Sequence, residues 1–183
     1  MKTPKLNGTR VVFGPVRLSY VHLLAPHAFE GDNRDGKYST NILIPKNEKE
    51  TIEAIRTAIG NAVVAGKAQK WGGKGATPGR ANPLFDGDEK NEELYHGHYY
   101  LNAKSIQRPQ VVDIKKAPLT SDDDVYSGMW ACVSVSFYPY NIGGNGVACT
   151  INNVMKYKDD ERLSGGPGAA EDFDGFMDDP DDL

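Results

Sequence analysis

The stretch Met129-Trp-Ala-Cys-Val-Ser-Val-Ser-Phe-Tyr138 alternates between an apolar set of side chains and a second, mostly polar set. Every odd position from Met129 to Phe137 is apolar, whereas the even positions hold two serines, a cysteine and the rings of Trp130 and Tyr138. Because successive side chains of a β-strand point to opposite faces, this period of two predicts a strand with one buried face. The two rings fall on the other face and need a partner there.

Patterns on either side of this stretch predict four more strands and one helix. The helix follows Asn47, which forms a capping box with Glu50, and its last turn carries Lys67 and Lys70, as the helix dipole favours. The Gly14-Pro15 pair either bends the first strand or divides it in two. The other predicted strands are Val11–Leu24, Lys37–Ile44, Leu94–Lys104 and Val147–Tyr157.

Five strands and one helix predict a mainly β fold, and a small OB-fold-like five-stranded barrel suits that inventory best, although another α+β arrangement also fits. The 183 residues suffice for one domain with a single core. We place this domain at residues 1–163 and expect residues 164–183 to form a disordered acidic C-terminal tail.

The charge is distributed unevenly along the chain. The formal net charge is −4, yet residues 1–158 hold 20 Lys and Arg against 15 Asp and Glu. The last thirteen residues carry seven acidic side chains, two phenylalanines and no Lys or Arg. A basic body with an acidic tail is typical of a nucleic-acid binder whose tail competes with DNA or recruits a partner protein, although a solubilising tail has the same composition.

Rings and cations are interleaved in the segments that border the predicted sheet. Exposed rings can stack on successive bases of a single strand, and nearby cations can neutralise its phosphates. Packing of these rings under a loop or at a subunit interface is the alternative. The candidate DNA-binding residues are Trp71, Lys74, Arg80, Tyr100, Lys104, Arg108, Trp130 and Tyr138.

Other classes of protein fit the sequence less well. No apolar run of about 18 residues and no signal peptide is present, so we expect a cytoplasmic protein with no membrane contact. Cys132 and Cys149 lack metal-ligand spacing and are expected to be buried thiols. The Gly-rich loop Gly72–Gly79 lacks the order of a phosphate-binding loop. We expect no cofactor.

A metal-dependent nuclease or resolvase is the main alternative. His96 and His98 occupy one face of a predicted strand, and Asp86 can supply an oxygen ligand. A protein-interaction scaffold, with the tail as its active part, is the second alternative. No catalytic set can be assembled from local spacing, so we expect a binding protein without enzymatic activity and without a metal.

Four segments resemble a phage and prophage family first catalogued as a domain of unknown function. They are Asn82-Pro-Leu-Phe-Asp-Gly-Asp-Glu89, Leu101-Asn-Ala-Lys-Ser-Ile-Gln-Arg-Pro-Gln-Val-Val-Asp113, Ser127-Gly-Met-Trp-Ala-Cys-Val-Ser-Val-Ser-Phe-Tyr-Pro-Tyr-Asn141 and Gly146-Val-Ala-Cys-Thr-Ile-Asn-Asn-Val154. The resemblance implies an OB-fold protein that binds single-stranded DNA, without sequence preference, during phage DNA replication or recombination.

By the same resemblance, the acidic C-terminus is similar to tails that recruit polymerases, helicases and nucleases. This chain ends in Asp-Asp-Leu183 and has no terminal Phe, which favours a phage-encoded partner. The residues expected to contact that partner are Asp172, Phe173, Asp174, Phe176, Asp178, Asp179, Asp181 and Asp182.

Overall fold

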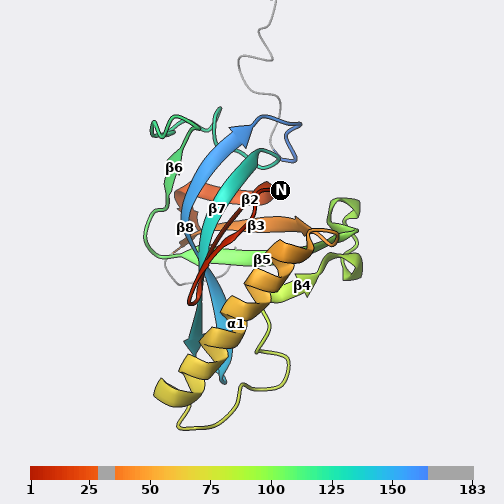
Figure 1. The fold of residues 1–183 in the computed structure, drawn as a ribbon. Coiled ribbons are helices and arrows are strands. Elements are labelled where there is room, and N and C mark those ends of the chain that lie inside the picture. Colours follow the sequence, from red (N-terminus) through yellow and green to blue (C-terminus); the bar gives the residue numbers. More distant parts are fainter. Residues whose placement is uncertain (29–35, 165–183) are drawn as a thin grey trace, which may run out of the picture.

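The structure, a computed structural model, describes residues 1–28 and 36–164. Five long strands close into a barrel, so the predicted mainly β, OB-fold-like architecture is confirmed (Figure 1). Around the barrel the strands follow the order β2, β3, β5, β8, β7 and back to β2. The barrel strands are β2 (Arg10–His27), β3 (Lys37–Pro45), β5 (His98–Ser105), β7 (Trp130–Tyr140) and β8 (Gly146–Lys158).

The closing contact is the parallel pairing of β5 with β8 at Ala103 and Cys149, and the other four barrel pairings are antiparallel. Smaller elements decorate the barrel: β1 pairs with β2, β4 with β5, and β6 with β8. Their bounds, with those of the two 3-10 helices, are β1 (Lys5–Asn7), β4 (Leu84–Asp86), η1 (Gly87–Glu89), η2 (Glu93–Tyr95) and β6 (Gln110–Val112).

The alternation in β7 forms the core as predicted. Met129, Ala131, Val133, Val135 and Phe137 are all buried, together with Leu101 and Ala103 of β5. In β5 the alternation starts later than expected, because residues 93–95 form η2 and the strand begins at His98. Cys149 is fully buried, which raises the pKa of its thiol, and Cys132 is half-buried.

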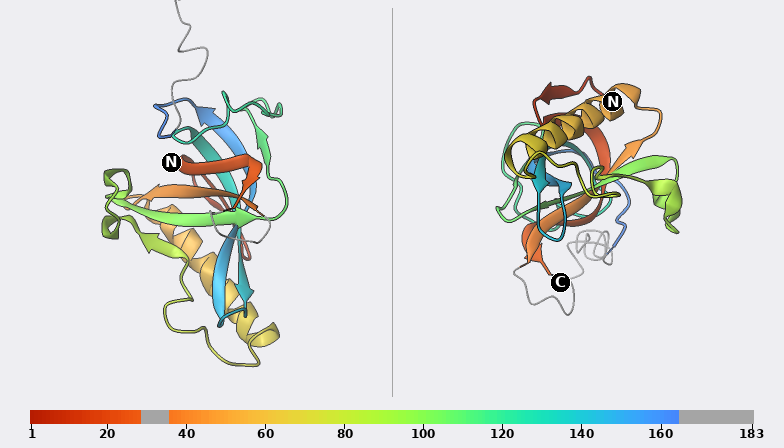
Figure 2. Two further views of the ribbon diagram at one scale, coloured as in Figure 1. Left: turned by 180° about the vertical axis from the view of Figure 1, so that it is seen from behind. Right: turned by 90° about the horizontal axis from the view of Figure 1, so that it is seen from below.

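The helix α1 (Lys49–Gln69) packs its buried side chains chiefly against β7. Its N-cap is Glu48, with no side-chain hydrogen bond, so the capping box predicted at Asn47 is not formed. Figure 2 shows, from behind, that β5 crosses the front of the barrel while α1 lies on the opposite side. The helix therefore does not cover the side of the barrel on which β5 lies.

In the part of the chain that the structure describes, no helix combines the length and the apolar character needed to span a membrane.

The strand β2 is continuous through Gly14-Pro15, but its pairing register shifts at three places. One shift, against β7, lies between Phe13 and Val16, where the sequence pattern allowed a bend. Two shifts, against β3, lie between His22 and His27 and between Ser19 and His22, and at the latter β2 carries one extra residue. A β-bulge of this kind re-aims side chains, and here it turns the end of β2 toward the open side of the barrel.

Candidate nucleic-acid interface

The outer face of β5 provides the floor of a groove on the open side of the barrel. Asn102 and Lys104 are exposed on this face, whereas Leu101 and Ala103 between them are buried. The neighbouring strand β3 contributes Asn41 and Ser39, which pair in register with Asn102 and Lys104. In OB-folds the face of the second and third barrel strands binds oligonucleotides, and β3 and β5 hold those positions here.

A first hollow of about 460 Å³ lies beside the part of β2 where its pairing with β3 is irregular. Its walls combine aromatic, amide and hydroxyl groups with one cation. The lining residues are Tyr20, His22, His27, Ser39, Thr40, Asn41, Asn102, Ala103 and Lys104. The imidazoles of His22 and His27 stack with their centroids 4.1 Å apart and their planes 9° from parallel. Burial, and then the neighbouring His27, lower the pKa of His22, which favours the neutral imidazole.

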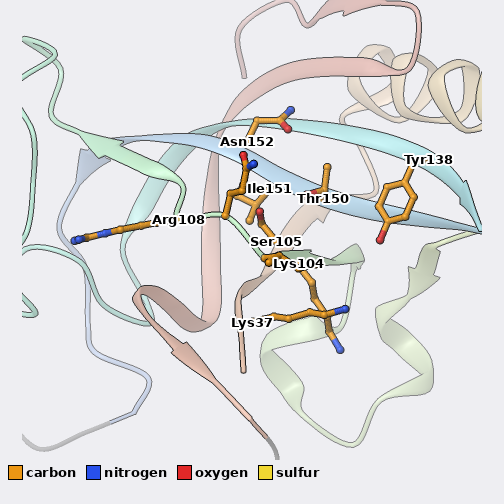
Figure 3. Close-up of a pocket in the computed structure, with 10 residues that line it drawn as sticks. Lys37, Lys104, Ser105, Arg108, Tyr138, Thr150, Ile151 and Asn152 are labelled. Carbon is orange, nitrogen blue, oxygen red and sulfur yellow. The ribbon is translucent and has the colours of Figure 1, made fainter. Parts of the chain in front are cut away.

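A second hollow of about 560 Å³ continues the first along β5 and β8. Figure 3 shows Arg108 at one end and Tyr138 at the other, with Lys37 and Lys104 between them. The remaining lining residues are Ser105, Ile106, Gln107, Thr150, Ile151 and Asn152. Because Lys104 lines both hollows, we treat them as one surface and call it the groove.

The groove is positively charged along its length. It contains Lys37, Lys104 and Arg108, and no carboxylate is found among the described residues that line it. Its aromatic side chains present free surface: Tyr138 is 43% exposed and Tyr20 is 51% exposed. Such rings can take a base against one face, and the cations that line the same hollows can pair with phosphates.

Three of the predicted residues, Lys104, Arg108 and Tyr138, come together in the groove, although this does not test their role in binding. Tyr100 lies on the same face of β5 but is half-buried, with Phe85 5.4 Å and Tyr95 5.1 Å from its ring centroid. Its packing leaves little ring surface for a base.

Lys74 and Arg80 lie on the loop after α1, which rests on the turn between β7 and β8. Thr77 donates its backbone N–H to Asn145, and its hydroxyl accepts the N–H of Asn145 in return. Both predicted cations are exposed and line neither hollow. They can extend the groove only if DNA also runs past this turn.

Trp71 occupies the core, contrary to its predicted role as a stacking ring. It is 4% exposed, and its indole N–H donates to the backbone oxygen of Tyr140 at 2.9 Å. The ring packs against Gly66, where an added Cβ would lie 2.6 Å from it. No face of the indole is accessible to a base, so the sequence interpretation of Trp71 is wrong.

Trp130 lies outside both hollows. Its indole N–H donates to the carboxylate of Asp160 at 2.7 Å, and the ammonium of Lys158 lies 5.1 Å from the ring centroid. The Trp130 contact, and then the backbone N–H of Glu161, lower the pKa of Asp160. Trp130 thus fastens the segment after β8 to the barrel, although this contact does not test the stacking on DNA that the sequence predicted.

The residues of the nuclease alternative are engaged in other contacts. Asp86 accepts from Lys46 at 2.6 Å, and Asp88 holds the same ammonium. Ring nitrogens of His96 and His98 lie 2.8 and 2.9 Å from backbone carbonyls. In the described part of the chain, no cluster of three or more metal-ligating side chains occurs. The predicted tail contacts, from Asp172 to Asp182, lie outside the described residues.

No local pattern in the sequence predicted Tyr20, His22 or Lys37 as groove residues. Tyr20 lies in the bulge of β2 and His22 follows it, and Lys37 is the first residue of β3. Only the pairing of β2 with β3 brings them to the outer face of β5.

Comparisons with known proteins show what the whole chain is similar to. Residues 9–183 match a family model described as the ssDNA-binding protein of Enterobacter phage Enc34. Protein p50 of Acyrthosiphon pisum secondary endosymbiont phage 1 is 34% identical over 174 residues, which span 87% of this chain and 92% of that protein.

Two solved structures are also similar. The single-stranded DNA-binding protein from bacteriophage Enc34, solved in complex with ssDNA, is 26% identical with a TM-score of 0.74 over 90% of this chain and 95% of that one. The single-stranded DNA-binding protein gp2.5 of bacteriophage T7 shares the fold, with 18% identity and a TM-score of 0.53 over 88% of this chain and 92% of that one. With nearly its whole length matched, the chain belongs to the family of the Enterobacter phage Enc34 ssDNA-binding protein.

Proposed function

We propose that this protein binds single-stranded DNA along the groove. The observation that carries the proposal is a continuous surface in which two hollows share Lys104, cations and exposed rings line the same hollows, and no described lining residue is acidic. The family match supports it, since the Enc34 protein was solved with ssDNA bound.

In the proposed mode of binding, bases stack on Tyr138 and Tyr20 while Lys37, Lys104 and Arg108 pair with phosphates. Stacking favours single strands, because bases within a duplex have both faces covered by their neighbours. It also tolerates any sequence, since every base has a π-face. Asn41 and Asn102 can donate to and accept from the edge of a base, but an amide matches the edges of several bases and selects weakly.

Lys74 and Arg80 are a separate extension of the proposal, in which DNA also contacts the loop beside the turn between β7 and β8; the salt dependence of binding tests this extension independently of the groove. The loop that carries them is fixed to that turn through Thr77 and Asn145, so their backbone positions are defined. In OB-folds the loop between the last two strands contributes to oligonucleotide binding, and residues 141–145 occupy that position.

The cellular role belongs to the same proposal. A protein that coats single strands without sequence preference serves phage DNA replication or recombination, where such strands are exposed. Residues 164–183, with their acidic and aromatic side chains, are proposed to recruit a phage polymerase, helicase or nuclease.

The test is fluorescence anisotropy with labelled single-stranded and double-stranded oligonucleotides of the same sequence. Tyr138→Ala should weaken single-strand binding by about 1 to 3 kcal/mol, the value of one base stacked on a ring. Tyr157→Ala is the matched control, because Tyr157 is 52% exposed on β8 and lines neither hollow. Equal affinity for both forms of DNA, or equal effects of the two substitutions, would contradict the proposal.

The same mixtures, incubated with Mg²⁺, test the alternative. Intact oligonucleotides are expected on a denaturing gel, whereas cleavage that depends on His96 and His98 would establish the nuclease instead.

A further inference from the structure

Tyr20 stands in an unusual backbone conformation at the edge of the groove. Its φ is +48°, in the left-handed backbone region that residues other than glycine rarely adopt. It occupies the bulge between Ser19 and His22, where the next residue, Val21, donates its backbone N–H to the hydroxyl of Ser127 at 2.9 Å. The bulge directs Tyr20 outward, and half of its side chain is exposed beside the first hollow. An exposed ring on a bulge needs further contacts to stay in one position.

Glu92 supplies such a contact from a separate part of the chain. The hydroxyl of Tyr20 donates to one carboxylate oxygen of Glu92 at 3.1 Å, and the ammonium of Lys90 pairs with the other at 3.2 Å. The same ammonium lies 5.6 Å from the centroid of the Tyr20 ring. Glu92 and Lys90 therefore hold Tyr20 at its hydroxyl end and over its face.

This pair of residues is itself firmly anchored to the barrel. The Lys90 ammonium lies 4.0 Å from the ring centroid of Tyr95 and 5.1 Å from that of Tyr100. Tyr95 is fully buried, and its hydroxyl accepts a hydrogen bond of 2.8 Å from the amide of Asn41, a residue of β3 that lines the first hollow. The contacts of Glu92 thus connect β2, the β4–β5 connection and β3 around one end of the groove.

We infer that Glu92 is a positioning residue that strengthens the binding of single-stranded DNA by holding the Tyr20 ring as a platform for a base. The inference rests on the proposed function of the groove. The negative charge of Glu92 alone would weaken DNA binding, because a carboxylate repels a polyanion beside it. The inferred positioning role has the opposite effect on the affinity. Burial, and then the hydrogen bond to Glu92, raise the pKa of Tyr20, so its hydroxyl keeps the proton that it donates.

The charge of Glu92 and its positioning of Tyr20 would change the affinity for DNA in opposite directions, so substitution of Glu92 distinguishes between them. If Glu92 acts only through its charge, Glu92→Ala should tighten binding of a labelled oligothymidine. If it positions Tyr20, Glu92→Ala should weaken binding by about three- to fivefold, a part of the roughly 5- to 150-fold that the loss of one stacked base represents. Glu92→Gln keeps an oxygen that accepts from Tyr20 and should restore most of the affinity.

Glu89→Ala is the matched control. Glu89 is an exposed acid of the same connection, and its side chain has no hydrogen bond or ion pair within the described residues. This variant should bind with unchanged or slightly higher affinity. Melting temperatures of all variants show whether an effect comes from unfolding.

A double-mutant cycle separates the inference from the function on which it rests. In a Tyr20→Ala background, the further change Glu92→Ala should no longer weaken binding, because the ring that it positions is absent. Tighter or unchanged binding by Glu92→Ala alone, or an equal loss in both backgrounds, would overturn the inference. Failure of the wild-type protein to bind single strands would instead overturn the proposed function.

Discussion

Removal of the Lys104 ammonium should change how the affinity for single-stranded DNA depends on salt. Lys104 lines both hollows, and with Lys37 and Arg108 it makes three cations along the groove. Each phosphate contact with a single strand contributes about 0.7 to the slope of log affinity against log salt. Three contacts predict a slope of about −2.1, and Lys104→Ala should reduce it to about −1.4.

The difference is large enough to measure by anisotropy titrations at 50 and 200 mM salt. Over this fourfold range the wild-type affinity should fall about 18-fold and that of Lys104→Ala about sevenfold. Participation of Lys74 and Arg80 would steepen the wild-type slope to about −3.5, a fall of about 130-fold, so the same data decide whether DNA passes the turn between β7 and β8.

Lys49→Ala serves as the control, since Lys49 is exposed on α1 and lines neither hollow. Its slope should equal that of the wild-type protein. A slope that Lys104→Ala leaves unchanged would show that the phosphates lie elsewhere. An affinity indifferent to salt would refute the electrostatic part of the reasoning altogether.

Three further perturbations probe other parts of the molecule. Trp130→Ala should lower the melting temperature, because it removes the hydrogen bond to Asp160, and should change the single-strand affinity by less than about twofold. A loss of about 1 to 3 kcal/mol of binding free energy would show instead that the ring stacks on a base. Burial favours the neutral imidazole of His22, so its pKa in the folded protein lies below the ordinary 6.5, and the protein should lose stability as the pH falls through 6.5. Thermal melts between about pH 7 and 5 should show a smaller decrease of the melting temperature for His22→Gln than for the wild-type protein. Truncation after Leu163 should tighten single-strand binding at low salt, and this gain should disappear above about 0.1 M salt, where the charges of the acidic segment are screened. The truncation should also abolish capture of a phage polymerase or helicase. Unchanged binding in both assays would reduce the segment to a solubility device.

Alternation along a strand was the most reliable signal in the sequence. It predicted the buried face of β7 from Met129 to Phe137 and the exposed face of β5 at Asn102 and Lys104, and both are confirmed. The reason is geometric: in a closed barrel one face of every strand looks inward, so a period of two separates core from surface wherever the strand is regular. The barrel fold was predicted from the inventory of five strands and one helix, which also fitted another α+β arrangement.

Contacts between distant segments account for the sequence predictions that failed. Trp71 follows a helix in a Gly-rich loop and appears exposed in the sequence, yet Gly66 and the carbonyl of Tyr140 enclose it. Tyr140 is 69 residues away along the chain, so no local pattern contains this information. Tyr20 was missed for a related reason, because its bulge depends on the pairing of β2 with β3.

Alternation also fails to say where along a strand a side chain lies. Trp130 and Tyr138 share one face of β7, and both rings need a partner on that face. They are eight residues apart, which corresponds to about 26 Å at 3.3 Å per residue, so they occupy different ends of the barrel. Tyr138 reaches the groove beside β8, whereas Trp130 meets Asp160 in the segment that follows β8. The carboxylate that satisfies the indole comes from the chain itself, and this explains why a ring on a polar face is by itself no evidence for a bound base.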